Sequence, residues 1–384
     1  MKTILYVIKS MAMLAGTERA VSLKINWLAS HGYRVVLVTY EQGSHPIILP
    51  LHPDVIVEDL KTPFFVIRKY SLFRRVFKFL RLKLIFRSRL RSVLEKIRPD
   101  IVLTTAYSLE VVKDLFEVHA NSKLIIESHE TCSSVIKEYA YKSHSFMLLL
   151  AKLYDKYNLK YVNRFDRMVT LTQGDAKEWR KHIFAPIQVI PNPLTDYPLS
   201  LREKYENTSF RIISVGRLEE VKGFDRLVKA FAIIEDKCPK WHIDIFGKGC
   251  CEGELRELIA SYHLENRIKI LPPTNNIYSE YLNSDFYVLT SYHEGLGMVL
   301  LEAMACGIPC VSFDCDYGPK EVIDDGNTGL LIENGNVEKL AQSILWMIEH
   351  PNERIQMGEN ARKAVKRYQI DGIMQQWVDL FNRI

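Results

Sequence analysis

Short runs of apolar residues alternate with longer amphipathic stretches along this chain of 384 residues. Short runs rich in Val, Ile and Tyr are typical of buried strands, and amphipathic stretches between them are typical of helices. The pattern predicts strands at Ile4–Ile8, Arg34–Tyr40, Ile101–Thr105, Lys123–His129 and Arg167–Thr172 in the first half, and at Arg211–Gly216, His242–Gly247, Arg267–Leu271, Phe286–Ser291, Pro309–Phe313 and Gly329–Glu333 in the second. Regular alternation of this kind is typical of parallel sheets built from βαβ units.

The stretch VIPNPLTDYPLS, which starts at Val189, interrupts the alternation with three prolines. Proline disfavours helix in the residue before it, so the stretch is typical of a linker. We predict an N-terminal domain over residues 1–191 and a C-terminal domain over residues 192–368, with a last helix over about 369–384 that packs back on either domain. Each domain is expected to be a Rossmann-like doubly wound α/β parallel sheet. The two are expected to face across a cleft, with ligands outside the carboxyl ends of the strands.

Length and composition agree with two globular domains. The chain is longer than one core usually covers, and 47% hydrophobic with 25% charged residues is typical of a soluble globular protein. Its seven scattered cysteines form neither a disulfide ladder nor a CxxC metal pair, so we expect structural thiols in a reducing cytosol. The apolar run at the N-terminus is broken by Lys9, so we interpret it as a first strand, with a signal peptide as the minor alternative.

One segment, from Arg68 to Arg98, is strongly basic, with twelve Lys and Arg and one acidic residue, although the whole chain carries a net charge of only +5. Apolar residues recur in it at helical intervals among the cations. Such a helix can lie in a membrane interface and bind anionic lipid. The candidate membrane-docking residues are Arg74, Arg75, Lys78 and Arg81. An alternative of equal weight is a core helix with a basic outer face. Nothing here resembles a nucleic-acid-binding module.

The stretch SYHEGLGMVLLEAMACGIP, from Ser291 to Pro309, has candidate chemistry. Glycine tolerates sharp turns and lets a ligand approach the main chain, so Gly295 and Gly297, on either side of Leu296, predict a turn from strand to helix. The N–H groups of Gly297, Met298 and Val299 would then lie at the positive end of a helix dipole, a site suited to a diphosphate.

Two glutamates belong to the same stretch, and neither is explained by packing. Glu302, one turn into the helix, can accept hydrogen bonds from a vicinal diol such as a ribose. Glu294 is placed to meet the sugar attached to the phosphate. The alternative is that both pair with neighbouring Lys or Arg.

A second element, SVGRLEEVKG, places Arg217 just after a predicted strand and Lys222 before Gly223, which opens the next helix. Two cations at the carboxyl edge of a sheet can bind a diphosphate and stabilise it as a leaving group. Taken alone, this pair is more simply interpreted as solvated. Both features occur in one domain and at strand ends, which favours a shared ligand.

Three stretches, SVGRLEEVKGFDRLVKAF, SYHEGLGMVLLEAMACGIPCVSFD and GPKEVIDDGNTGLLI, strongly resemble the nucleotide-sugar-dependent glycosyltransferases of family 4, which have the GT-B architecture. The opening AGTERAVSLKINWLASHGYRVVLVT and the linker VIPNP are also similar to that family.

The resemblance implies a role for each matching residue. Arg217 and Lys222 would bind the donor diphosphate, Glu302 the ribose and Glu294 the transferred sugar. Gly16 would let the first domain approach the donor phosphate, and His129 looks like the family's histidine that contacts the sugar near the reaction centre.

The resemblance also implies a mechanism and a donor. Members retain the anomeric configuration, with no dedicated base and no metal, so the DCD sequence at Asp314–Asp316 is interpreted as a loop. The stretch SFDCDYGPKEVI, which contains Pro319 and Glu321, is similar to that of members that use UDP-activated galactose or N-acetylhexosamines. This similarity favours UDP over GDP as the donor nucleotide.

The sequence therefore predicts a retaining glycosyltransferase without a cofactor. It would transfer a hexose or N-acetylhexosamine from a UDP-sugar to a saccharide, expected to be lipid-linked, in surface polysaccharide biosynthesis. We expect it in the cytoplasm, peripheral on the inner face of the cytoplasmic membrane. The alternatives are a sugar-nucleotide epimerase of the same fold and a catalytically silent, membrane-associated scaffold.

Overall fold

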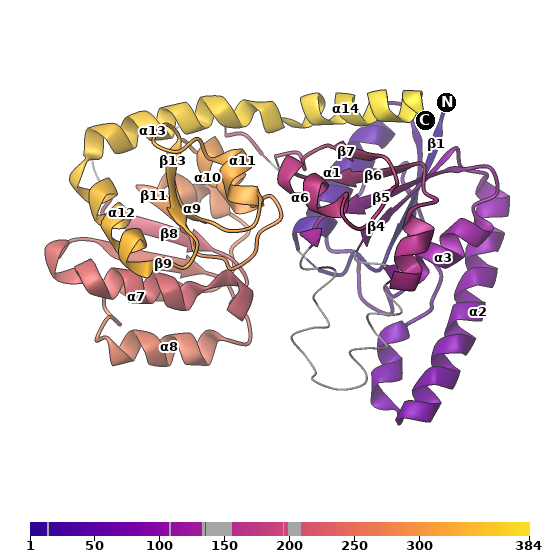
Figure 1. Cartoon of the computed structure of the whole chain (residues 1–384), viewed down its shortest axis with the longest axis horizontal. Coiled ribbons are helices and arrows are strands. Elements are labelled where there is room, and N and C mark those ends of the chain that lie inside the picture. The colour runs from indigo at the N-terminus through magenta and orange to yellow at the C-terminus, as the bar shows by residue number, and fades with distance from the viewer. Residues whose placement is uncertain (14, 107–108, 133–134, 136–155, 195, 199–208) are drawn as a thin grey trace. The chain divides into compact units, whose positions relative to one another are not determined.

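The structure is a computed structural model of the whole chain (Figure 1). It describes residues 1–13, 15–106, 109–132, 135, 156–194, 196–198 and 209–384. The chain divides into two compact units, and each has its own parallel sheet. The first unit comprises Met1–Pro193 and Ile373–Ile384, and the second comprises Leu194–Gly372. Part of the predicted linker, residues 195, 199 and 200, lies outside the described residues.

The first unit contains a seven-stranded parallel sheet in the order β3-β2-β1-β4-β5-β6-β7. All six residues of β1 are buried, as expected for a strand covered on both faces. Its strands are β1 (Thr3–Ile8), β2 (Arg34–Thr39), β3 (Ile56–Asp59), β4 (Ile101–Thr105), β5 (Lys123–Ser128), β6 (Arg167–Thr170) and β7 (Ile187–Val189). Its helices are α1 (Gly16–Ser30), α2 (Leu72–Ile97), α3 (Leu109–Val118), α6 (Gln173–Trp179) and most of α14 (Ile370–Arg383).

The second unit contains a six-stranded parallel sheet in the order β10-β9-β8-β11-β12-β13. Its strands are β8 (Arg211–Val215), β9 (His242–Phe246), β10 (Ile268–Leu271), β11 (Phe286–Leu289), β12 (Cys310–Asp314) and β13 (Gly329–Glu333). Its helices are α7 (Phe224–Ile234), α8 (Glu252–Ser261), α9 (Ile277–Leu282), α10 (Met298–Ala305), α11 (Gly318–Val322), α12 (Val337–Glu349) and α13 (Pro351–Ala364). Helix α7 packs on α12.

The predicted α/β fold of two doubly wound parallel sheets is confirmed, and every predicted strand is present. Two strands were missed, β3 and β7, and both lie at the edges of the first sheet. Neither has a fully buried residue, so their sequences lack the apolar run that identifies a central strand.

The last helix contacts the first unit at several points. The ammonium of Lys2 donates a hydrogen bond to the carbonyl of Phe381, and the ring of Tyr33 lies edge-on to the ring of Phe381 at 6.5 Å. Ile373, Met374 and Trp377 form part of the buried face of this helix. The C-terminal residues therefore complete the core of the unit in which the chain begins.

Candidate functional site

Lys222 and Glu294 meet at the carboxyl edge of the second sheet. Lys222 Nζ lies 2.7 Å from Glu294 Oε2, and the two side chains keep 19% and 15% of their surface exposed. Ser291 donates a second hydrogen bond to the same carboxylate oxygen over 3.1 Å. Glu294 is thus paired with a neighbouring lysine in this structure. Such pairing was the alternative to ligand binding in the sequence analysis. Because both side chains remain partly exposed, a ligand can reach them.

The backbone around Gly223 explains why Lys222 lies there. Gly223 has a φ of +61°, and a Cβ at this position would lie 2.3 Å from the carbonyl oxygen of Thr290. The Tyr292 N–H donates to the Val221 carbonyl at 2.8 Å, so the loop after β8 runs against the loop after β11. Any side chain at Gly223 would separate the two loops.

The turn into α10 has the backbone that the glycines predict. Gly297 is the N-cap residue of α10, with φ 82° and ψ 63°. Leu300 N–H donates to the Gly297 carbonyl at 2.8 Å, which begins the helical hydrogen-bond series. Within the described residues, no hydrogen bond is made by the N–H groups of Gly297, Met298 and Val299. Leu296, just before them, is buried. The start of α10 therefore presents unpaired donors at the positive end of its dipole.

Glu302 lies deeper than Glu294. It is 4% exposed and accepts a hydrogen bond from the Tyr281 hydroxyl at 3.3 Å. Burial, and after it the charge of Glu302, raises the pKa of Tyr281 well above its ordinary value, so this phenol stays a donor. Tyr281 therefore fixes the orientation of the carboxylate predicted to meet a ribose.

The side chain of Arg217 is more exposed than those of Lys222 and Glu294. Its side chain is 57% exposed, and it pairs with Glu219 at 3.0 Å. An exposed pair of this kind is weak and exchanges readily. Arg217 is thus free to turn toward a stronger anion such as a diphosphate.

A third loop, between β12 and α11, borders Glu294. A Cβ at Gly318 would lie 3.0 Å from the Gly295 carbonyl oxygen. His293 Nδ1 lies 2.9 Å from Asp316 Oδ2, which links the two loops. Asp314 is the last residue of β12 and Asp316 is part of the turn that follows. Among the described residues, no group of three or more His, Cys, Asp or Glu side chains could hold a metal ion.

His129 and Gly16 belong to the first unit. His129 follows β5 directly, and its side chain is 3% exposed. A Cβ at Gly16 would meet no atom within 4 Å, so neither backbone strain nor packing in the described structure requires glycine there. Close approach of the donor phosphate to Gly16 therefore stays a prediction.

The membrane-docking residues lie in the first half of α2. Arg74, Arg75 and Arg81 are exposed. Lys78 is half-buried, with its Nζ 3.5 Å from the centre of the Tyr70 ring. The four apolar side chains exposed beside them are Val76 (56%), Phe77 (70%), Leu80 (56%) and Leu84 (70%).

The second half of α2 differs from the first. Phe86, Leu90 and Leu94 are buried in the core. Lys83 contacts Asp114 and Arg87 contacts Glu117, both on α3. The second half thus fits the interpretation as a core helix, and membrane docking by the first half stays a prediction. None of the described helices is long and apolar enough to cross a membrane.

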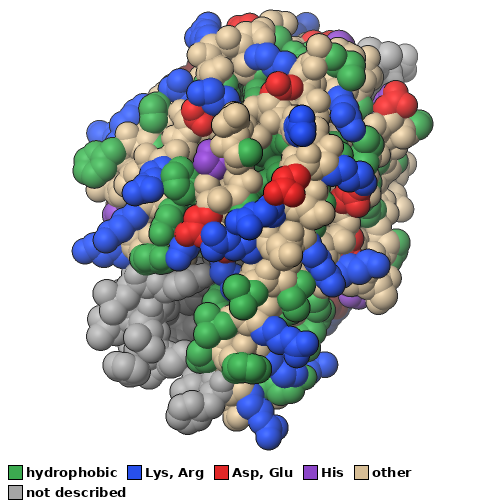
Figure 2. Space-filling model, turned by 90° about the vertical axis from the view of Figure 1, so that its right-hand side faces the viewer, with side chains coloured by type: hydrophobic (Ala, Val, Ile, Leu, Met, Phe, Trp, Pro, Cys, Tyr) green, Lys and Arg blue, Asp and Glu red, His purple; other side chains and the backbone are tan. Residues whose placement is uncertain are grey.

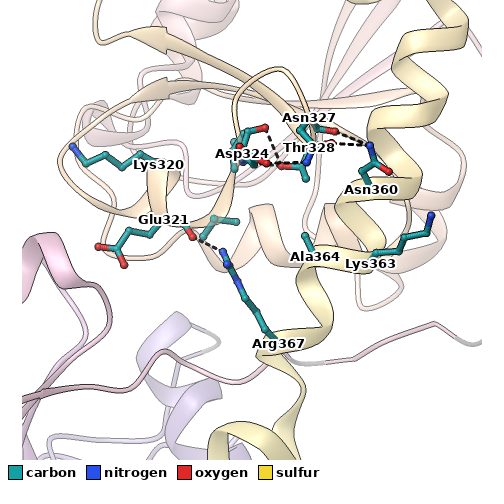
Figure 3. A pocket seen from close by; sticks show the side chains of 11 residues that line it. Lys320, Glu321, Asp324, Asn327, Thr328, Asn360, Lys363, Ala364 and Arg367 are labelled. Carbon is teal, nitrogen blue, oxygen red and sulfur yellow. Dashed lines mark hydrogen bonds between the residues drawn. The ribbon is translucent and has the colours of Figure 1, made fainter.

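A polar pocket of about 630 Å³ lies elsewhere in the second unit, beside α13 (Figure 3). Asn360 of α13 donates from Nδ2 to the Asn327 side-chain oxygen at 2.8 Å, and Arg367 donates to the Glu321 carbonyl at 2.6 Å. None of the residues predicted to bind the donor diphosphate, ribose or sugar lines this pocket, although Glu321, which the sequence linked to the type of donor, does. Its own groups already satisfy one another in part, so we assign it no role in the site.

Several residues of the site were missed from the sequence. Ser291 and Tyr281 hold the two glutamates, and Gly318 brings the third loop against Gly295. Ser291 stands three residues before Glu294, a spacing typical of local side-chain contacts, and this signal could have identified it. Tyr281 lies on another helix, and nothing in the sequence pattern indicates its contact with Glu302.

Comparison with known families covers most of the chain. Residues 14–195 match the family described as Glycosyltransferase Family 4. Residues 201–364 match the family described as Glycosyl transferases group 1. The two matches follow one another along the chain and correspond closely to the two units.

Some known proteins are similar to this chain over nearly their full length. An uncharacterized glycosyltransferase of Haemophilus influenzae is 29% identical over 378 residues, which is 98% of this chain and 99% of that protein. The amylovoran biosynthesis glycosyltransferase AmsD of Erwinia amylovora is 26% identical and is covered completely, as is this chain. Among solved structures, a variant of S. aureus TarM in complex with fondaparinux, α-GlcNAc-glycerol and UDP has a TM-score of 0.77 over the whole of both chains, at 16% identity.

Proposed function

Because this chain belongs to the glycosyltransferases, with a family 4 domain followed by a group 1 domain, we infer that it transfers a hexose or N-acetylhexosamine from a UDP-sugar to a saccharide acceptor. The observation that supports this most strongly is the partly exposed pair of Lys222 and Glu294 beside the start of α10. A cation, unpaired N–H groups and a carboxylate converge there, and these are the groups that a diphosphate-linked sugar needs.

Binding of the donor would rearrange the pair. The diphosphate would take Lys222 and Arg217 as its cations and the N–H groups at the start of α10 as its donors. Glu294, released from Lys222 and still held by Ser291, would then accept hydrogen bonds from hydroxyl groups of the sugar. Glu302, oriented by Tyr281, would accept those of the ribose. Since the two cations supply the positive charge, we propose that the reaction needs no metal ion.

The transfer step would retain the anomeric configuration. The bond between the sugar C1 and the donor phosphate oxygen breaks, and the acceptor oxygen forms its bond to C1 on the same face. The acceptor proton passes to the departing phosphate, whose growing negative charge is stabilised by Lys222 and Arg217. Glu294 and His129 would contact the sugar in this step. Holding both substrates in one geometry would supply much of the rate.

The relatives support a choice of donor and acceptor. The TarM complex contains UDP, and AmsD is named for the biosynthesis of amylovoran. Pro319 and Glu321 are similar to members that use UDP-galactose or UDP-N-acetylhexosamines. We therefore propose UDP as the nucleotide and a growing surface polysaccharide, linked to lipid, as the acceptor.

A transfer assay tests this function. Purified protein would be incubated with UDP-glucose, UDP-galactose or UDP-N-acetylglucosamine and lipid-linked saccharide acceptors, and products would be followed by NMR. We expect release of UDP that depends on the acceptor, with a product of unchanged anomeric configuration. Conversion of the donor to another sugar nucleotide without acceptor would instead identify an epimerase. Failure to bind any nucleotide would favour the scaffold.

The first half of α2 supports a second part of the proposal, docking on an anionic membrane from the cytoplasmic side. Apolar side chains at 76, 77, 80 and 84 are exposed among cations. Figure 2 shows hydrophobic side chains gathered among Lys and Arg on this face of the molecule. Among the described residues, Arg74 and Arg81 form no ion pair, in contrast to Lys83 and Arg87 of the second half. An apolar stripe flanked by cations is suited to the headgroup region of a bilayer.

Vesicle sedimentation tests the docking. Replacing Arg74, Arg75, Lys78 and Arg81 with Glu should release the protein from vesicles that contain phosphatidylglycerol, and Leu84→Ser should weaken binding less. A matched control replaces the exposed cations Lys237, Lys240, Arg256 and Lys269 of the second unit with Glu, which changes the net charge equally. Equal loss of binding in the control would show that overall charge, and not α2, holds the protein on the vesicle.

A further inference from the structure

Three titratable side chains meet in the interior of the first unit. Lys24 of α1 contacts Glu127 of β5, and His129 Nε2 lies 3.0 Å from the same carboxylate oxygen, Glu127 Oε2. Their side chains are 3%, 2% and 3% exposed, respectively. Burying charged groups is costly, and a buried ion pair often stabilises a fold no better than apolar residues would. Clusters of this kind are therefore more frequent at functional sites than elsewhere.

Two aromatic rings enclose the ammonium of Lys24. The Lys24 Nζ lies 4.7 Å from the centre of the Trp377 ring and 5.6 Å from that of Tyr6. Trp377 comes from α14, so the C-terminal helix covers this cluster. Aromatic faces stabilise a cation that has lost its water. The structure thus holds Lys24 in one place beside Glu127.

His129 has polar atoms without partners. Its Nε2 is close to Glu127, yet the geometry is not that of a hydrogen bond, and neither ring nitrogen makes one within the described residues. Glu127 Oε1 and the Tyr6 hydroxyl also lack a partner there. Buried polar atoms nearly always have one. Both nitrogens of the imidazole and one oxygen of the carboxylate beside it are thus unpaired, which indicates a place where a ligand with hydroxyl groups can supply the missing bonds.

The charges around His129 keep its imidazole neutral. Burial, and after it the positive charge of Lys24, lowers the pKa of His129 well below its ordinary value. Burial also lowers the pKa of Lys24 and raises that of Glu127. Their direct contact acts in the opposite direction, because each charge stabilises the other. Wherever the shared proton resides, the pair has no net charge, and a neutral imidazole has one donor and one acceptor nitrogen.

We propose that Lys24 and Glu127 are positioning residues for His129, which hold its imidazole in the uncharged form at the end of β5 and leave its buried nitrogens unpaired, as one donor and one acceptor for hydroxyl groups of a sugar. This rests on the proposed function, in which His129 contacts the transferred sugar. Glu127 sets the position of the ring. Lys24 neutralises Glu127, whose unpaired charge would otherwise hold a second proton on the imidazole and remove its acceptor.

The first test is an NMR titration of protein labelled at histidine, with the His129 signal identified by its loss in His129→Asn. Lys24→Met should raise the pKa of His129 by about 1 to 3, because an unpaired carboxylate then lies beside the ring. Glu127→Gln should not raise it, because the charge of Lys24 remains. Tyr6, whose ring faces Lys24, is kept in all variants. Equal His129 pKa values in wild type, Lys24→Met and Glu127→Gln would overturn the proposal.

The second test measures transfer with a UDP-sugar, at several pH values. Lys24→Met should lower kcat at least tenfold, with the KM for donor little changed, and should shift the acidic limb of the pH profile upward with the His129 pKa. If a single variant does not fold, Lys24→Met combined with Glu127→Gln leaves an uncharged pair and carries the test. The pKa of His129 in this folded double variant should equal that of wild type, because neither charge remains beside the ring, and a raised pKa would overturn the proposal.

The two tests separate this proposal from the function on which it rests. The titration needs no transferase activity. A wild-type protein that transfers no sugar would contradict the proposed function, whereas the titration would still show whether Lys24 and Glu127 control the protonation of His129.

Discussion

Two Lys–Glu pairs of this protein have the same chemistry and opposite surroundings. Lys222 and Glu294 keep 19% and 15% of their side chains exposed, whereas Lys24 and Glu127 keep 3% and 2%. The first pair can exchange its partners for a ligand, because water and solutes reach it. The second cannot exchange without leaving a charge in the protein interior. Burial thus separates a pair suited to binding from a pair suited to positioning.

The largest effect is expected from removing the lysine of the buried pair. Lys24→Met should lower the free energy of unfolding of the first unit by about 3–5 kcal/mol, since Glu127 would be left buried without its partner. Denaturant unfolding followed by tryptophan fluorescence measures the change. Adding Glu127→Met should recover most of the loss. A stability equal to wild type in Lys24→Met would show that the buried pair is not coupled.

The matching change in the exposed pair should affect ligand binding instead of folding. Lys222→Ala should weaken UDP binding about 10- to 100-fold, as expected for loss of a charge-assisted hydrogen bond, and slow the transfer. Isothermal calorimetry gives the affinity, and thermal unfolding without ligand serves as the control. An unchanged affinity would remove Lys222 from the donor site.

The buried histidine predicts an effect of pH on the first unit. Because the pKa of His129 in the folded chain lies below its ordinary value of 6.5, the unfolded chain binds a proton that the folded chain does not. Acid therefore favours unfolding below about pH 6.5, with a slope of up to about 1.4 kcal/mol per pH unit. Hydrogen exchange at pH 6.5 and 5.5 would measure it. His129→Asn should lack this part of the slope, and an identical slope in both proteins would contradict the assignment.

The smallest effect is expected from the hydroxyl that orients Glu302. Tyr281→Phe removes one donor from this carboxylate and should cost about 0.5–1.5 kcal/mol of UDP binding. The ring remains in the core, so the unfolding temperature should change little. Tyr278→Phe, on the same helix, is a matched control. Equal effects of the two substitutions on affinity would indicate a general effect of the helix.

The partly exposed pair of Lys222 and Glu294 and the loops around it could largely be predicted from the sequence. Gly295, Gly297, Glu294 and Glu302 belong to one short stretch, in which a strand runs into a helix, so spacing alone places them near one edge of the sheet. Most strands could also be predicted, because each has its own apolar run. β3 and β7 were missed because these two edge strands bury little apolar surface.

The buried pair could not be predicted in this way. Lys24 and Glu127 are 103 residues apart, on a helix and a strand, and each taken alone is an ordinary charged residue. Their contact depends on the parallel pairing of β4 with β5 and on the packing of α14, which contributes Trp377. A single sequence has no periodic signal for such a contact, so only the folded structure reveals it.

Calorimetric titration with UDP and with GDP, without added metal, tests the central claim most directly, with wild type compared to Glu302→Gln. We expect UDP to bind more tightly than GDP, and Glu302→Gln to weaken the binding while the protein keeps its unfolding temperature. Binding of neither nucleotide would contradict the proposed function, and the two glutamates would then serve as partners for groups of the protein, Lys222 and Tyr281 among them.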